Sequence, residues 1–231
     1  GHEVRQIERT GQRVWLETPA GMLETRFLIT CAGVYADRVA TLSGAPREPR
    51  IVPFRGDYYI LKPEQRHLIN ALIYPVPDPA FPFLGVHSTL KMDGSMWLGP
   101  NAVLAFGREG YGRWDVNIPD LADAVGYRGF QRLARSYWQV GLAEMLRDWS
   151  KTRFVAAVQR FVPEVTAAGV VEGPAGIRAQ ALALDGSMVD DFVFHQDGPV
   201  IHVRNAPSPA ATSSLMIGAQ ISDMAAESFG L

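Results

Sequence analysis

Apolar and polar residues alternate along the first part of the chain, as they do in half-buried β-strands. The alternation runs through three short stretches, separated by turns that contain Gly11 and Gly21. This pattern predicts a meander of three strands at residues 4–8, 14–17 and 22–27.

The next element is an apolar run at residues 27–31, which predicts a strand covered on both faces. The run ends at Gly33, and residues 36–42 predict a short helix closed by Gly44. A strand that stops at a glycine and leads into a helix indicates the second half of a β-α unit. The first half would lie before residue 1.

The pattern changes twice in the middle of the chain. Prolines cluster between residues 45 and 100, so helices are not expected there, and Asp93-Gly94 is a hairpin turn signal. The strands predicted in this region are 51–61, 68–74, 83–88 and 95–98. From Phe130 to Val162 the apolar spacing becomes helical and stops at Pro163.

This helical segment carries an apolar stripe and many basic residues. The stripe consists of Phe130, Leu133, Ala134, Tyr137, Gly141, Leu142, Met145 and Trp149. Between Arg128 and Pro163 there are seven basic residues and only two acidic ones, Glu144 and Asp148. We interpret the segment as a core-facing stripe with a solvated basic face. Contact with an anionic membrane surface is the alternative.

The last third of the chain returns to strands. Residues 192–195 and 200–203 flank Asp197-Gly198 and predict a hairpin, and a closing helix is expected at 212–229. The order of elements predicts an α/β to α+β fold with two domains. The outer domain would be discontinuous, with the inserted one between its two pieces: 1–44 and 170–231 outside, 45–169 inside.

Composition narrows the class of protein. The chain of 231 residues is 47% hydrophobic and 20% charged, which is typical of a globular protein, and its net charge of −2 argues against a nucleic-acid partner. The single cysteine, Cys31, rules out an internal disulfide and a cysteine-based zinc site. No apolar run approaches the ~20 residues of a membrane-spanning helix. We expect a cytoplasmic protein, with peripheral contact at the inner face of the membrane as the alternative.

The start of the closing helix is the first candidate site. Residues 207–214 place small side chains and prolines just ahead of it. Free backbone N–H groups and about half a positive charge collect at such a helix start, which suits the negative edge of a reduced flavin. An ordinary capped helix is the alternative interpretation.

Two arginines and a histidine are the other candidates. Arg178 beside Gly176, and Arg55 beside Tyr58, could pair with a carboxylate through two parallel hydrogen bonds. His87 could accept a proton near neutral pH, as oxidation of an alcohol requires. Purely structural roles are the alternatives for all of them. We find no metal-ligand pattern and no G-x-G-x-x-G or phosphate loop.

Several stretches together resemble a known family. In this order they are 31–38 (CAGVYADR), 52–59 (VPFRGDYY), 73–79 with 83–87, 99–102 (GPNA), and 176–180 (GIRAQ) with 205–214 (NAPSPAATSS). Along nearly the whole chain the sequence resembles the L-2-hydroxyglutarate oxidase/dehydrogenase family of the D-amino-acid-oxidase-like FAD-dependent oxidoreductases. We therefore interpret it as a fragment without that family's N-terminal phosphate-binding region.

The resemblance implies a flavoenzyme that uses FAD. L-2-hydroxyglutarate or a close 2-hydroxyacid would be oxidised to the 2-oxoacid by hydride transfer to the flavin, and the electrons would pass to oxygen or a quinone. The outer domain would be the remaining part of the FAD-binding domain, and the inner one a mixed-sheet domain that binds the substrate. The alternatives are an amine-oxidising relative of the glycine or D-amino-acid oxidase type, and an inactive fragment that acts only in binding or assembly.

The residues assigned on this basis fall into three groups. The catalytic base is His87, and the substrate-binding residues are Arg55, Tyr58 and Arg178. The cofactor-binding residues are Ala32, Gly33, Gly176, Ile177, Ser208, Pro209, Ala210, Ala211, Thr212 and Ser213.

Overall fold

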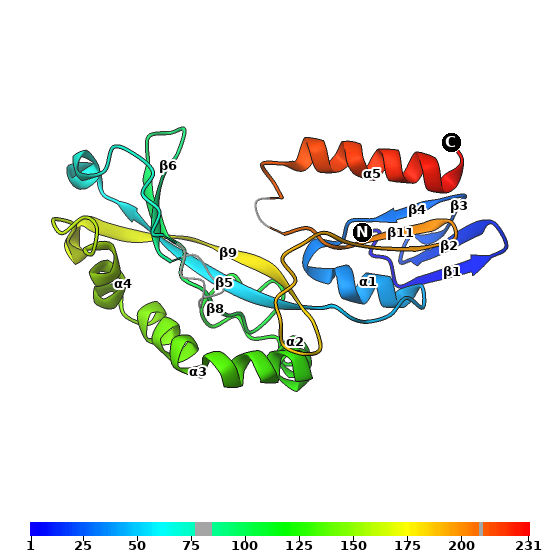
Figure 1. The fold of residues 1–231 in the computed structure, drawn as a ribbon, viewed down its shortest axis with the longest axis horizontal. Helices are drawn as coiled ribbons and strands as arrows, with labels where there is room; N and C mark the ends of the chain where they lie inside the picture. The colour runs from blue at the N-terminus through cyan, green and yellow to red at the C-terminus, as the bar shows by residue number, and fades with distance from the viewer. Residues whose placement is uncertain (77–84, 208–209) are drawn as a thin grey trace. The chain divides into compact units, whose positions relative to one another are not determined.

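In a computed structural model, which describes residues 1–76, 85–207 and 210–231, the chain is a mixed α/β protein, as predicted (Figure 1). The described residues form two compact units. One contains residues 1–52 and 179–231, and the other contains residues 53–178.

Two long strands contribute residues to both units, β5 (Arg50–Leu61) and β9 (Val170–Leu182). They pair with each other. Lys62 donates a hydrogen bond to the carbonyl of Gly169 just beyond one end of the pair, and Ile51 packs with Ala181 near the other. The strands therefore run in opposite directions. The units divide within these strands, at 52/53 and 178/179, which is eight and nine residues later than the boundaries expected at 44/45 and 169/170.

The first unit is built on a three-stranded sheet in the order β10–β11–β4. Strand β11 (Val200–Asn205) runs antiparallel to β10 (Val193–Asp197) and parallel to β4 (Leu28–Thr30). Helix α1 (Ala36–Leu42) lies on one side of this sheet and α5 (Ser214–Phe229) on the other (Figure 1). Helices on both sides of parallel strands are typical of an α/β layer.

The first unit also contains the predicted antiparallel meander. Its strands are β1 (Gln6–Thr10), β2 (Arg13–Thr18) and β3 (Gly21–Thr25). Ile7 and Val14 are buried in one cluster with an apolar residue of β11, so the meander and the parallel pair share a core.

The second unit has a sheet in the order β6–β7–β5–β8, with β9 also paired to β5. Its remaining strands are β6 (His87–Leu90), β7 (Met96–Gly99) and β8 (Val103–Leu104). Its helices are α2 (Ile118–Gly126), α3 (Arg128–Asp148) and α4 (Lys151–Val158), and they lie along one side of the sheet (Figure 1). Short 3₁₀ helices occupy Gly33–Tyr35, Pro63–Leu68 and Ala167–Gly169.

The strand register gives this second sheet two distinct faces. Trp97 of β7 is paired with Ile60 of β5 on one side and with Thr89 of β6 on the other. Directly paired residues share a face, and so do residues two apart on a strand. Tyr58, His87 and Trp97 therefore lie on one face, which we call the aromatic face.

The opposite face, which we call the helix face, is buried. Tyr59, Ser88 and Leu98 belong to it and are at most 4% exposed. The ring of Tyr59 lies 4.6 Å from that of Phe154 in α4, and Val158 of the same helix joins this core. In α4, the apolar residues of the segment that was predicted to be helical up to Val162 therefore face the core.

Some predicted elements were wrong. The run at 27–31 was expected to be covered on both faces, but Ile29 is 40% exposed and Cys31 is exposed, because β4 is an edge strand of its sheet. Residues 68–74 form only an isolated bridge at Ile73, after a 3₁₀ helix that starts at a proline. Of the strand predicted at 83–88, residues 83 and 84 lie outside the described part, and β6 begins at His87.

The long helical prediction also needs correction. Leu133 of the expected core stripe in α3 is buried, but Leu142 and Trp149 are 50% and 55% exposed. The inward side of the second half of α3 carries charged residues instead. No described helix is long and apolar enough to cross a membrane.

Candidate functional site

The predicted cofactor residues of the first unit follow two parallel strands. Thr30 of β4 is paired with His202 of β11, so the carboxyl ends of these strands lie at the same edge of the sheet. Ala32 and Gly33 follow β4 at this edge, and the stretch that leads into α5 follows β11. Ligands of open α/β sheets bind outside the carboxyl ends of the strands. Both segments thus follow strand ends at the sheet edge where folds of this type bind a ligand.

Gly33 makes the turn after β4 possible. Its φ is +54°, a backbone conformation that favours glycine, and no atom lies within 4 Å of the place where a Cβ would stand. With the small Ala32 before it, this turn leaves the backbone accessible.

The start of α5 borders a cavity of about 470 Å³ in the same unit. The N-cap, Ser213, makes no side-chain hydrogen bond to the helix, and the first turn contains no acidic residue. Among the described residues, the first turn of α5 therefore offers no countercharge to the positive end of the helix dipole. The residues around the cavity include Phe192, Pro207, Ala210, Ser213, Met216 and Ile217.

The remaining cofactor candidates can be placed only in part. Ala211 and Thr212 are exposed at the start of α5, whereas Ser208 and Pro209 lie outside the described residues. Gly176 and Ile177 lie on β9 within the second unit, and nothing stands within 4 Å of a Cβ at Gly176.

The aromatic face of the second unit brings two predicted site residues together. The His87 ring stacks on Tyr74 with 4.3 Å between centroids, and Tyr58 contacts Trp97 edge-on at 5.4 Å. Burial and the nearby Tyr74 raise the pKa of Tyr58, which keeps its hydroxyl protonated as a hydrogen-bond donor.

The hydrogen bonding of His87 defines its tautomer. Nδ1 lies 3.0 Å from the carbonyl oxygen of Gly85, which can only accept, so Nδ1 carries the proton and Nε2 keeps its lone pair. Burial lowers the pKa of His87, against the opposing effect of this hydrogen bond. The ring is therefore neutral at physiological pH, and Nε2 can accept a proton.

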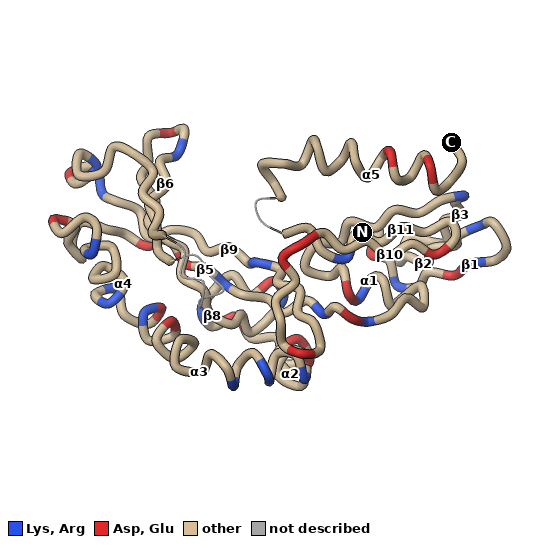
Figure 2. Tube along the Cα trace, in the orientation of Figure 1, with Lys and Arg blue, Asp and Glu red and all other residues tan. Residues whose placement is uncertain are grey.

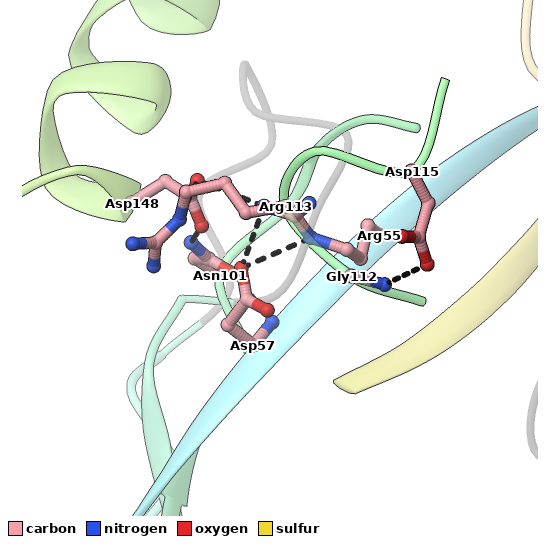
Figure 3. Close-up of polar contacts among 7 residues, drawn as sticks. All are labelled: Arg55, Asp57, Asn101, Gly112, Arg113, Asp115 and Asp148. Atoms are coloured by element: carbon pink, nitrogen blue, oxygen red, sulfur yellow. Dashed lines mark hydrogen bonds and ion pairs between the residues drawn. The ribbon is translucent and has the colours of Figure 1, made fainter. Parts of the chain in front are cut away.

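Arg55 lies in a network of charges on the helix face (Figure 3). Its side chain is 4% exposed; its Nη2 lies 3.0 Å from Asp57 Oδ2 and 2.8 Å from Asp148 Oδ2 at the end of α3. Arg113 Nε approaches the same Asp148 oxygen at 3.2 Å, and Asn101 donates to Asp148 Oδ1 at 2.9 Å. Asn101 also accepts a 2.6 Å hydrogen bond from the backbone of Asp57. We call these five residues the charge network.

The two carboxyl groups of the charge network differ in proton affinity. Burial, the hydrogen bond to Asp148 and repulsion by its charge raise the pKa of Asp57 to about 7, against the attraction of Arg55. At Asp148 burial acts in the same direction, but hydrogen bonds from Asp57 and Asn101 and the charges of Arg55 and Arg113 outweigh it, so its pKa is lowered. Below about pH 7 the pair therefore carries one proton, held mainly by Asp57, and it loses this proton as the pH rises through that value.

Arg55 and Tyr58 do not converge, although both were assigned to the substrate. Arg55 reaches Asp57, two residues away on the same side of β5, while Tyr58 points to the aromatic face. Arg178 is half-buried on β9 in the same unit.

Sequence reasoning missed most of the charge network. Asp57 and Asn101 lie inside stretches that carried the family resemblance, and the two-residue spacing of Arg55 and Asp57 was a usable signal. Asp148 gave none, because it is 93 residues from Arg55 in sequence.

Comparison with known proteins places the chain in a family. Residues 1–224 match DAO, the FAD dependent oxidoreductase family. The chain belongs to this family.

Relatives within the family are more specific. The chain is 57% identical over 216 residues to the mitochondrial L-2-hydroxyglutarate dehydrogenase of Nematostella vectensis, covering 90% of this chain and 47% of that protein. It is 50% identical to the human mitochondrial enzyme of that name, over 90% of this chain and 46% of that protein. The L-2-hydroxyglutarate dehydrogenase of Indibacter alkaliphilus is 46% identical, over 99% and 58%. The chain thus spans about half the length of the curated relatives it matches.

Solved structures share the fold at low sequence identity. The FAD-bound L-alpha-glycerophosphate oxidase of Mycoplasma pneumoniae aligns with a TM-score of 0.68 at 18% identity, over 97% of this chain and 50% of that one. The glycerol-3-phosphate dehydrogenase of Bacillus halodurans, complexed with FAD, gives 0.57 at 12%, over 100% and 39%.

Proposed function

We propose that the protein catalyses the FAD-dependent oxidation of L-2-hydroxyglutarate, or a close 2-hydroxyacid, to the 2-oxoacid. The observation that carries this proposal is the identity of 45% to 57% with L-2-hydroxyglutarate dehydrogenases over 89% to 99% of this chain.

The residues of the first unit fit the flavin part of FAD. The accessible backbone at Ala32 and Gly33, the apolar wall of the cavity and the start of α5 suit a flat ring that gathers negative charge when reduced. We assign cofactor binding to these residues and to Ala210, Ala211, Thr212 and Ser213. Cofactor binding by Gly176 and Ile177 stays a prediction from the sequence. Bound FAD would supply the acceptor for the hydride that leaves the alcohol carbon.

The residues of the second unit would bind and deprotonate the substrate. Arg178 would hold a carboxylate through its guanidinium, and Tyr58 would donate a hydrogen bond from the aromatic face. His87 would take the hydroxyl proton at Nε2. Because Asp57 and Asp148 already occupy Arg55 on the helix face, we assign Arg55 to the positioning of β5.

The electrons would leave to oxygen or to a membrane quinone. Peripheral contact of the protein with the inner face of a membrane would bring it close to a quinone. The relatives from animals are named mitochondrial, and the bacterial relative is not.

Flavin spectroscopy tests the proposed reaction. The purified protein is titrated with FAD and mixed, without oxygen, with L-2-hydroxyglutarate, its D enantiomer, glycine or a D-amino acid. We expect loss of oxidised-flavin absorbance with L-2-hydroxyglutarate only. Bleaching by the amines alone would favour the amine-oxidising alternative, and a protein that binds no FAD would favour a role in binding or assembly.

A further inference from the structure

In the second half of helix α3 the acidic side chains are buried and the apolar ones are exposed, the reverse of an ordinary amphipathic helix. In its second half the acidic residues point inward, with Glu144 7% and Asp148 4% exposed. Asp148 is paired with Arg55 and Arg113 in the charge network, and Glu144 is paired with Arg147. The inward side is therefore satisfied by charge pairing. The apolar residues of this half lie on the opposite side of the helix.

The outward side of the same half is apolar. Trp138, Leu142, Leu146 and Trp149 are 61%, 50%, 36% and 55% exposed. Their spacing of four, four and three residues puts them on one stripe of the helix. A helix stripe that faces solvent normally carries polar residues. Two tryptophans and two leucines on one such stripe are typical of an interaction surface.

The neighbouring loop adds further apolar side chains. Arg113 ties this loop to the end of α3 through its contact with Asp148. The adjacent Trp114 is 75% exposed, as is Ile118 at the start of α2.

The exposed charge along α3 and α4 has one sign. Between residues 128 and 160 the only acidic residues are Glu144 and Asp148, and both are buried. Basic positions recur along α3 and into α4 (Figure 2). The exposed charged residues of the segment are Arg128, Arg132, Arg135, Arg153 and Arg160.

We propose that the outward side of α3 rests on the surface of an anionic lipid bilayer. We define this α3 surface by two sets of residues on either side of a kink at Tyr137. The first half of α3 contributes Arg128, Arg132 and Arg135, and the second half contributes Trp138, Leu142, Leu146 and Trp149. The tryptophans and leucines enter the headgroup region, and the arginines contact anionic headgroups. The proposal specifies the membrane contact suggested with the proposed function, but its physical basis is independent of the reaction.

Charge favours a lipid surface over a second copy of the chain. A symmetric dimer through the α3 surface would place the same basic residues on both sides of one interface, where like charges repel. An anionic bilayer complements both properties of the surface, its apolar stripe and its positive charge.

Vesicle binding tests the proposal. The protein is sedimented with phosphatidylcholine vesicles that contain or lack phosphatidylserine, at low and high salt. We expect binding only to the phosphatidylserine vesicles, weakened by salt, with a blue shift of tryptophan fluorescence. Loss of one arginine, as in Arg135→Gln, should weaken partitioning about fivefold, and Leu142→Glu should weaken it at least about tenfold.

The matched control is Met92→Glu, which adds the same charge at a fully exposed apolar residue of the β6–β7 turn. It should bind vesicles about as well as the unchanged protein. Absence of binding, equal binding to neutral vesicles, or equal losses in Leu142→Glu and Met92→Glu would overturn the proposal. So would a dimer in solution that Leu142→Glu dissociates. Flavin reduction by L-2-hydroxyglutarate should survive in Leu142→Glu, which separates this proposal from the proposed function.

Discussion

The two faces of the sheet in the second unit differ in kind, although they alternate along the same strands. On the helix face, Arg55 and Asp57 belong to a buried network in which protein groups pair with one another. On the aromatic face, Tyr58, His87 and Trp97 are half-buried side chains that can still meet a ligand. Neighbouring side chains of a strand point in opposite directions. One set of side chains in residues 55–59 therefore packs against the helices, and the other set is available to contact a ligand.

The largest effect is expected from breaking the helix face with Asp148→Ala. This change removes the partner of Arg55, Arg113 and Asn101 and leaves the buried Arg55 under-compensated. We expect a loss of about 3–5 kcal/mol in the free energy of unfolding, measured by urea denaturation.

The matched control is Asp115→Ala. Asp115 is exposed and accepts a local hydrogen bond from the backbone of Gly112, so its loss should cost less than about 1 kcal/mol. If both variants lose the same stability, the charge network does not stabilise the helix face.

The aromatic face should respond to mutation in activity rather than stability. His87→Gln removes the basic lone pair but keeps a polar side chain of similar size, so turnover of L-2-hydroxyglutarate should fall about 100-fold. The free energy of unfolding should change by less than about 1 kcal/mol. The control is His67→Gln, at an exposed position of a 3₁₀ helix, which should keep full turnover. Unchanged turnover in His87→Gln would remove His87 from the proposed mechanism.

Local patterns predicted much of the fold. Helix α1, strand β5 and the β10–β11 hairpin were found because each rests on a short-range signal: a closing glycine, a β-rich run or an Asp-Gly turn. Strand β9 was missed, because Gly173, Pro174 and Gly176 interrupt its pattern.

The candidate site was only partly predictable. Strand alternation already places Arg55 and Tyr58, three residues apart, on opposite faces, so their separation could have been foreseen. The pairing of Arg55 with Asp148 could not, because it depends on where α3 packs. The packing of α3 also explains why its apolar stripe was wrongly predicted to face the core. A pattern of apolar residues shows which residues share a side of a helix, but not which side is buried.

A smaller effect is expected where β5 meets the turn after β7. A Cβ at Gly56 would stand 2.5 Å from Cβ of Pro100 and 3.0 Å from the carbonyl oxygen of Asn101, so Gly56→Ala must displace that turn. We expect a loss of about 1–3 kcal/mol in thermal or urea unfolding. Gly176→Ala on β9 is the control, since no atom lies within 4 Å of its Cβ. Equal stability of the two variants would show that the turn yields freely.

The smallest effect is the pH dependence that Asp57 gives to the helix face. Its pKa is raised from 3.8 to about 7, so between these values the folded protein holds a proton that the unfolded chain has released. The contribution of Asp57 to stability is therefore complete below about pH 4 and is lost as the pH rises toward 7, with a slope below about 1.4 kcal/mol per pH unit. Asp148, whose pKa is lowered, acts only at more acidic pH and does not oppose this trend.

Asp57→Asn isolates this contribution, because an amide resembles the protonated carboxyl group and does not titrate. Urea denaturation between pH 4 and 7 should show a stability that declines less with pH in Asp57→Asn than in the unchanged protein, while Asp115→Asn, at an exposed carboxylate, should keep the original slope. Parallel pH profiles for Asp57→Asn and the unchanged protein would mean that Asp57 is ionised throughout this range. Both carboxylates would then be charged beside Arg55 and Arg113, and the helix face would be held by balanced ion pairs with no shared proton.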